Sequence, residues 1–175
     1  IVNNTLFTEM RYSCVTRSRR FGKTLAAKML CAYYDRSCDS RHLFEDLQIA
    51  NDPSFEKHLN KYPVIYLDIT NFTSRDIPKE ELVATIQKEV KEETMSLYPD
   101  VKVSADDDLM ATLIKVAGQS NDRFIMIIDE WDAICREVAY DSTIMDKYVN
   151  LLRRLFKGSN TPQVFAGVYL TGILP

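Results

Sequence analysis

An unbroken apolar run at residues 124–128 (Phe-Ile-Met-Ile-Ile) ends in the acidic pair Asp129 and Glu130. Polar residues do not alternate with apolar ones along this run, so the pattern predicts a strand that is buried on both faces. Further apolar or β-prone runs predict strands at 12–16, 62–69 and 163–170, and helix-forming segments separate them. Strands that alternate with helices indicate an α/β fold built on a mostly parallel sheet.

Helices are expected between these strands, and capping residues indicate several of their ends. The first carries Leu25, Met29 and Ala32 on one face. Ser104 and Asp107 have capping-box spacing, which predicts a helix start at that point. The expected helices cover 23–34, a short stretch that begins at Asp52-Pro53, 80–98, 104–117 with Gly118 as its C-terminal cap, and 141–156, whereas 71–78 is expected to be a loop.

The segment 17–24 reads RSRRFGKT and lies between the predicted strand 12–16 and the predicted helix 23–34. Its Gly-Lys-Thr ending is that of the phosphate-binding loop GxxxxGK[ST], in which backbone amides and a helix N-terminus face phosphate groups. Gly22 would let the backbone approach closely, Lys23 would reach the β- and γ-phosphates, and the Thr24 hydroxyl would ligate Mg²⁺. The alternative is a chance occurrence of these three residues.

The loop departs from the standard pattern at its first position, where Arg17 stands in place of glycine. Arg19 and Arg20 make the loop strongly basic. Such a cluster is either a solvated loop whose charges pair with acids elsewhere, or a set of cations for the phosphates of a nucleotide or a nucleic-acid backbone. The residues alone leave both interpretations open.

The apolar strand that ends in Asp129 and Glu130 has the Walker B pattern. Asp129 would hold Mg²⁺ directly or through water, and Glu130 would orient and deprotonate an attacking water molecule. Ligands bind at the carboxyl ends of strands in open α/β sheets, which is where both this acidic pair and the loop 17–24 fall. The alternative is that Asp129 or Asp132 caps a following helix.

Four stretches resemble those of a known family: VTRSRRFGKT at 15–24, YPVIYLD at 62–68, IIDEWD at 127–132 and LTGILP at 170–175. They are similar to the bacterial predicted AAA-ATPase-like proteins, which are P-loop NTPases. The resemblance spans essentially the whole chain, and that family also lacks glycine at the position of Arg17. It implies a three-layer α/β P-loop NTPase core with strand order (5)-1-4-3-2, whose fifth strand would follow Pro175.

The same resemblance implies Mg²⁺-dependent binding and hydrolysis of ATP. It predicts Lys23, Glu130 and Thr171 as catalytic residues, with Thr171 at the place where related NTPases sense the γ-phosphate. Thr24 and Asp129 would hold the metal. The predicted nucleotide-binding residues are Arg19, Arg20, Phe21, Gly22, Lys23, Thr24 and Leu25.

Family members often carry a C-terminal domain that resembles restriction-endonuclease-like nucleases. Because the chain stops just after an apolar run, we expect residues 1–175 to be one ATPase-like domain that is truncated at its C-terminus. The expected partners are therefore ATP, a second copy of the chain, and nucleic acid through that further domain. A non-catalytic nucleotide-binding switch and a nucleic-acid-associated module are the alternative functions.

Composition narrows these functions. With 22 Lys and Arg against 25 Asp and Glu, the net charge of −3 does not favour a dedicated duplex-binding protein. The cysteines lack CxxC spacing, so we expect no zinc site, and Cys14 and Cys135 lie in or beside apolar segments that predict core positions. Short apolar runs and the lack of a signal-peptide pattern predict a cytoplasmic protein without membrane contact.

Overall fold

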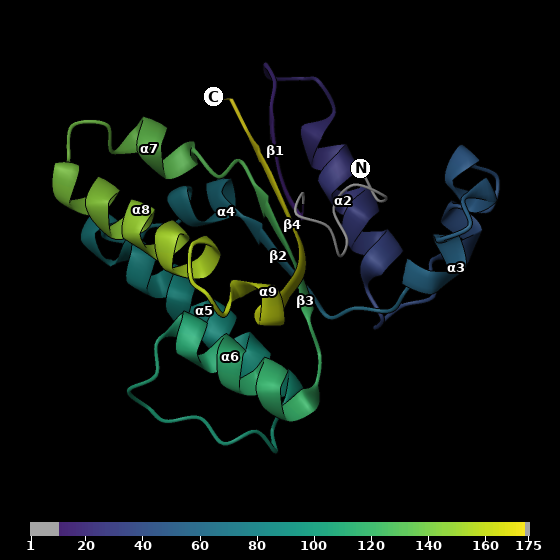
Figure 1. The fold of residues 1–175 in the computed structure, drawn as a ribbon. Coiled ribbons are helices and arrows are strands. Elements are labelled where there is room, and N and C mark those ends of the chain that lie inside the picture. Colours follow the sequence, from purple (N-terminus) through teal and green to yellow (C-terminus); the bar gives the residue numbers. More distant parts are fainter. Residues whose placement is uncertain (1–10, 174–175) are drawn as a thin grey trace. The chain divides into compact units, whose positions relative to one another are not determined.

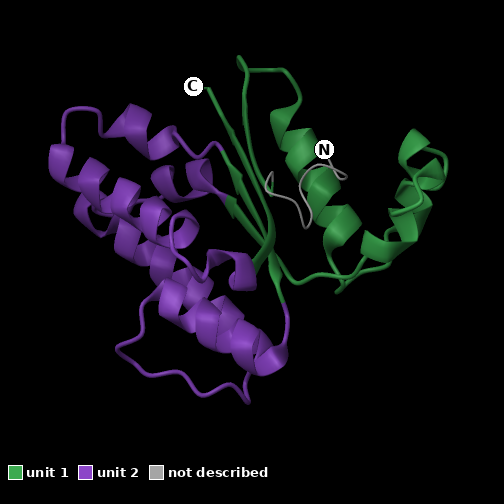
Figure 2. Ribbon diagram, viewed as in Figure 1, with its two compact units in different colours: residues 1–67, 123–129, 165–175 green, residues 68–122, 130–164 purple. Residues whose placement is uncertain are grey.

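The computed structural model describes residues 11–173 (Figure 1). These residues divide into two compact units, which Figure 2 distinguishes by colour. Unit 1 contains residues 11–67, 123–129 and 165–173, and unit 2 contains residues 68–122 and 130–164. Unit 1 carries the sheet, and unit 2 is helical.

Within residues 11–173, four parallel strands form a sheet in the order β1-β4-β3-β2. The strands are β1 (Tyr12–Thr16), β2 (Val64–Asp68), β3 (Phe124–Asp129) and β4 (Phe165–Gly172). Every residue of β3 is buried, as its uninterrupted apolar run predicts. The α/β class and the strand order 1-4-3-2 are confirmed, and the register pairs Thr16 with Gly172 and Ile128 with Leu170.

Helix α2 spans Lys23–Tyr34, as the sequence predicts. It packs on β3 and β4. Its buried face was not predicted, because the side chains that reach the core include Ala27 and Leu30. Leu25 and Met29, which lie on another face, are 65% and 41% exposed. Apolar residues occur on more than one side of this helix, so periodicity alone does not select the side that meets the sheet.

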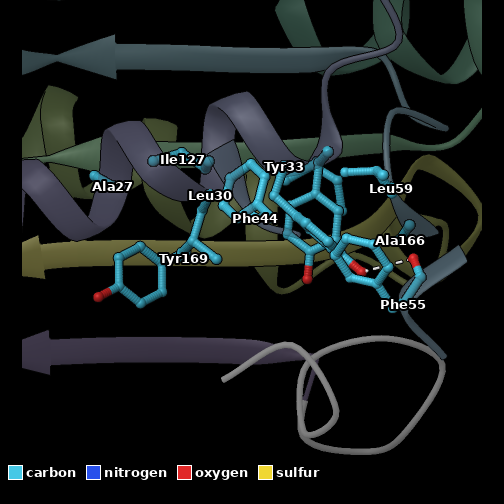
Figure 3. Close-up of a cluster of buried hydrophobic side chains, with 11 residues drawn as sticks. Ala27, Leu30, Tyr33, Phe44, Phe55, Leu59, Ile127, Ala166 and Tyr169 are labelled. Carbon is cyan, nitrogen blue, oxygen red and sulfur yellow. Dashed lines mark hydrogen bonds between the residues drawn. The ribbon is translucent and has the colours of Figure 1, made fainter. Parts of the chain in front are cut away.

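The other end of α2 packs on an aromatic cluster within unit 1, shown in Figure 3. The hydroxyl of Tyr33 donates to the carbonyl of Phe55 at 3.0 Å, and the ring of Phe44 meets that of Tyr33 edge-on. Phe44, which follows η1 (Arg41–Leu43), and Phe55 of α3 (Phe55–His58) belong to this cluster. Ile49 and Ala50 of η2 (Gln48–Asn51) pack against it. Helix α3 begins later than predicted, because the Asp52 carboxylate binds the amide and hydroxyl of Ser54 and holds a turn there.

Unit 2 is built around α5 (Leu82–Leu97), which contacts α6 (Leu109–Ser120) and α8 (Ser142–Phe156). The predicted loop at 71–78 is partly helical, because Asp68 caps the short helix α4 (Ile69–Thr73) by accepting from the amide of Thr70. The remaining elements are η3 (Lys79–Glu81), α7 (Ala133–Glu137) and α9 (Thr161–Val164). None of the helices between residues 11 and 173 is long and apolar enough to cross a bilayer.

The ends of α6 differ from the prediction. Asp108 is the N-cap, since its carboxylate accepts from the amide of Ala111 at 2.8 Å, and the contact between Ser104 and Asp107 stabilises the preceding loop instead. The helix continues past Gly118 to Ser120, and the capping residue that follows, Asn121, has a φ of 59°. Asparagine tolerates this left-handed conformation, so it replaces glycine as the helix terminator.

One expected core position is also wrong. Cys14 is exposed on β1, whereas Cys135 is half-buried. An apolar environment in the sequence does not say which side of a strand faces the core, and Cys14 lies on the outward side of β1. The predicted strand 163–170 begins only at Phe165, because residues 161–164 form α9.

Candidate functional site

Residues 17–22 form a loop between β1 and α2. Two residues in this loop have left-handed backbone conformations, Arg20 with a φ of 68° and Gly22 with a φ of 72°. Positive φ values favour glycine, which explains Gly22. A β-carbon built on Gly22 would meet no heavy atom within 4 Å, so the space beside this glycine is open to a ligand.

Lys23 lies at the start of α2 and is only 7% exposed. Its Nζ atom donates to the carbonyl oxygens of Arg17, at 3.0 Å, and Ser18, at 3.2 Å. The loop therefore curls around the ammonium group, and its carbonyls supply the acceptors that a buried cation requires. An anion held by the loop would meet this positive charge.

The first turn of α2 supplies further positive potential. The first helical hydrogen bond runs from the amide of Ala26 to the carbonyl of Gly22 at 2.9 Å. The amides before Ala26 in this first turn have no acceptor within the helix. Gly22, at the N-cap position, has no side chain that could accept from them. Thr24 is exposed in this turn, so its hydroxyl lies beside a helix end that attracts anions.

The other predicted nucleotide-binding side chains face solvent. Arg19, Arg20 and Leu25 are exposed, and Phe21 is 71% exposed. Neither of these arginines forms an ion pair with another residue in the range 11–173, and the same is true of Arg17. The basic loop is thus not explained by pairing with acids in the described part of the chain.

Asp129 lies at the end of β3 and is 1% exposed. Its Oδ1 atom accepts a hydrogen bond from the Thr171 hydroxyl on β4, and its Oδ2 atom accepts one at 3.4 Å from the Tyr66 hydroxyl on β2. A carboxylate this deeply buried needs such donors. The side chain is therefore held from both neighbouring strands.

Two ionisable groups near Asp129, the Cys31 thiol and the Tyr169 hydroxyl, are kept neutral. Burial raises the pKa of the Cys31 thiol to about 12, and the negative charges of Asp35 and Asp129 act in the same direction. Burial and the charge of Asp129 likewise raise the pKa of Tyr169. Neither group competes with Asp129 as an anion at neutral pH.

The loop and the carboxylate meet at one edge of the sheet. The amide of Arg17, which begins the loop, donates to the carbonyl of Gly172 at 3.2 Å. The preceding residue in the chain, Thr171, donates to Asp129. The ends of β1, β4 and β3 therefore bring the basic loop and the buried acid together in unit 1, as parallel pairing predicts.

Glu130 follows Asp129 directly and begins a segment of unit 2. Its φ is 52°, which is a strained value for a residue with a side chain. Its Oε2 atom accepts from the Arg136 guanidinium at 2.8 Å, and Arg136 also binds the fully buried Asp132 at 2.6 Å. The carboxylate of Glu130 is thus engaged by a cation from α7.

The chain matches the family model described as Predicted AAA-ATPase over residues 3–175. It belongs to the AAA-ATPase-like family. No curated protein matches it significantly. Membership confirms the resemblance seen in the sequence and places the chain, at the level of the family, among predicted ATPases that bind nucleotides.

The structure of this AAA-ATPase-like domain brings several of the predicted site residues together within unit 1. Lys23 lies inside the loop that ends at Gly22, and Thr171 contacts Asp129. Glu130 contacts Arg136 in unit 2. Of the predicted family stretch 170–175, the last two residues lie outside the described part of the chain.

Two residues of this AAA-ATPase-like domain contact predicted site residues but were missed in the sequence. Tyr66 lies on the strand next to β3, and only the sheet order reveals that its hydroxyl reaches Asp129. Arg136 lies four residues after Asp132, a helical spacing that brings side chains together and could have indicated the pair.

Proposed function

We propose that this domain binds ATP together with Mg²⁺ and hydrolyses the bond to the γ-phosphate. The observation that carries the proposal is the loop 17–22, which is folded around the Lys23 ammonium at the N-terminus of α2. Amides, a helix dipole and a lysine converge there, and together they favour a polyphosphate over a singly charged anion. The exposed Arg19 and Arg20 add charge for the outer phosphates.

The residues at this edge fit a magnesium ion. Mg²⁺ prefers oxygen ligands and is commonly bound through one or two protein groups plus substrate phosphates. The Thr24 hydroxyl and the Asp129 carboxylate are groups of this kind, and no set of three or more His, Cys, Asp or Glu side chains in residues 11–173 forms a separate metal site. When bound, the ion would neutralise charge that develops on the phosphates.

Hydrolysis requires a base for the attacking water, and Glu130 has the suitable chemistry beside Asp129. Its strained backbone supports this role, since left-handed non-glycine residues cluster at functional positions. Lys23 would hold the β- and γ-phosphates, and Thr171 would contribute its hydroxyl group at the same edge of the sheet.

The ion pair between Glu130 and Arg136 favours a second candidate function. A carboxylate oxygen that is held by a guanidinium is less available to orient and deprotonate a water molecule. The domain would then bind ATP without turnover and act as a nucleotide-dependent switch. The two candidates share the binding site and differ only at Glu130.

The binding site is tested by titrating the 175-residue chain with a fluorescent ATP analogue. Lys23→Ala should weaken binding by at least about 100-fold, because a charge-assisted contact to phosphate is lost. Lys28→Ala is the matched control, since Lys28 is exposed on the same helix. Equal affinity of the Lys23 variant and the wild type would refute the proposed site.

Turnover separates the two candidate functions. If the domain is an ATPase, wild-type chain releases phosphate and Glu130→Gln binds ATP but releases none. If it is a switch, both proteins bind ATP and neither releases phosphate. A phosphate-release assay with saturating ATP and Mg²⁺ distinguishes these outcomes.

A further inference from the structure

We propose that Thr171 and Tyr66 are positioning residues that fix the Asp129 carboxylate for the metal–nucleotide complex. The inference rests on the proposed function and deepens it, because it gives Thr171 a role other than sensing the γ-phosphate. Neither residue touches the reacting atoms in this role. Both act through Asp129.

The geometry that supports this role is a three-strand arrangement. Asp129 ends the inner strand β3, Thr171 lies on β4 to one side, and Tyr66 lies on β2 to the other. Each carboxylate oxygen receives one hydroxyl, Oδ1 from Thr171 and Oδ2 from Tyr66. Two donors on opposite oxygens restrict rotation of the carboxylate about its side-chain bond and leave each oxygen a second lone pair.

Burial argues against a sensing role for Thr171. Its side chain has no exposed surface, and its hydroxyl hydrogen is donated to Asp129. A hydroxyl has only one hydrogen to donate, so Thr171 cannot also donate to a phosphate oxygen while it holds the carboxylate. Tyr66 is only half-buried and lies further from Asp129, so we expect its contribution to be the smaller of the two.

Positioning has a thermodynamic signature that does not need turnover. Metal and nucleotide strengthen each other's binding when Asp129 is held in place, and this coupling is the ratio of nucleotide affinities with and without the metal. Some residues hold a metal ligand by a hydrogen bond without binding the metal themselves. Substituting such a residue typically lowers metal affinity by roughly 10-fold or more. A sensor of the γ-phosphate would instead affect triphosphates alone.

The experiment measures this coupling by calorimetry on the 175-residue chain, with Mn²⁺ or with EDTA. Titrations use ADP and a non-hydrolysable ATP analogue. The variants are Thr171→Val, which removes the hydroxyl at constant shape, Thr171→Ser, which keeps it, and Tyr66→Phe. Tyr62→Phe is the matched control, because the Tyr62 hydroxyl binds His58 at 2.8 Å and not Asp129.

The expected result is a roughly 10-fold loss of coupling in Thr171→Val, a smaller loss of about 3-fold in Tyr66→Phe, and none in Thr171→Ser or Tyr62→Phe. The loss should be equal for ADP and the ATP analogue. If the wild type shows no metal coupling, the proposed function fails and the inference fails with it.

Wild-type coupling that persists in both Thr171→Val and Tyr66→Phe overturns the inference alone. A loss confined to the ATP analogue also overturns it, because it identifies Thr171 as a phosphate sensor. Tyr66→Phe keeps the test decisive if Thr171→Val does not fold, since it removes one hydroxyl from a half-buried side chain.

Discussion

Single residues of this domain adopt conformations that their neighbours in three dimensions stabilise. Glu130 has a φ of 52°, and a left-handed conformation costs a residue with a β-carbon on the order of 1 kcal/mol or more. The strain persists because Arg136 holds the side chain of Glu130 and that of the buried Asp132 at once. Arg136 therefore supports the local fold through contacts with both carboxylates.

Removing this guanidinium should destabilise the domain. Arg136→Ala takes a cation away from Asp132, which has no exposed surface, so we expect the free energy of unfolding to fall by about 1–3 kcal/mol. Arg153→Ala is the control, because Arg153 is exposed and contacts Asn150 at 3.3 Å, and it should change stability by less than about 0.5 kcal/mol. Urea unfolding at pH 7 measures both, and equal stability of the two variants would contradict this account.

At the scale of elements, helix ends depend on single capping side chains. The Asp108 carboxylate accepts from the amide of Ala111 at the start of α6, and it also pairs with Arg154 of α8. Asp108 therefore both caps α6 and links α6 to α8. Sequence spacing had instead favoured Ser104 with Asp107 as the start of this helix.

Substitutions at Asp108 can separate these two contributions. Asp108→Asn keeps a capping oxygen but removes the charge, whereas Asp108→Ala removes both. We expect Asp108→Ala to lose about 1 kcal/mol of unfolding free energy and Asp108→Asn to lose less than half of that, because an exposed ion pair contributes little. Thermal unfolding followed by circular dichroism would show the difference, and an equal loss would assign the effect to the ion pair.

The last residue of α3 is a histidine, His58, whose titration affects stability. Burial lowers the pKa of His58 below its ordinary value of 6.5, the charge of Lys57 lowers it further, and Asp52 opposes this shift. The Nδ1 atom of His58 lies 2.8 Å from the Tyr62 hydroxyl, and the two rings stack. The folded state therefore favours neutral His58.

The sign of the pH dependence follows from this lowered pKa. As the pH falls below about 6.5, the unfolded chain binds a proton that folded His58 resists, so the stabilisation is fully present above that pH and is lost below it. Between pH 7.5 and 5.5, wild type should lose more unfolding free energy than His58→Gln. His42→Gln is the control, since His42 is exposed, and it should follow the wild type. Urea midpoints that shift equally in all three proteins would argue against this role.

At the scale of the whole molecule, unit 1 is built from three segments that are distant in the sequence. The loop around Lys23, the carboxylate of Asp129 and the hydroxyl of Thr171 come from three such segments of unit 1. Glu130 begins a segment of unit 2. The proposed nucleotide-binding residues and the proposed base therefore belong to different compact units.

Hydrogen exchange can locate the nucleotide within this arrangement. ATP with Mg²⁺ should slow exchange of the amides at 18–25 several-fold, because phosphates would accept from them. Amides in the middle of α5 serve as the internal reference and should not change. Protection confined to α5 would place the ligand in unit 2 and contradict the site proposed at the loop.

The sequence by itself determined the features that short-range patterns encode. The strand at 12–16, the helix at 23–34, the buried strand that ends in Asp129 and the loop with Lys23 are all local, because backbone geometry and side-chain periodicity act over a few residues. The tertiary structure decided which distant residues meet. Thr171 and Tyr66 lie 42 and 63 residues from Asp129, and only the order of strands in the sheet makes them its partners.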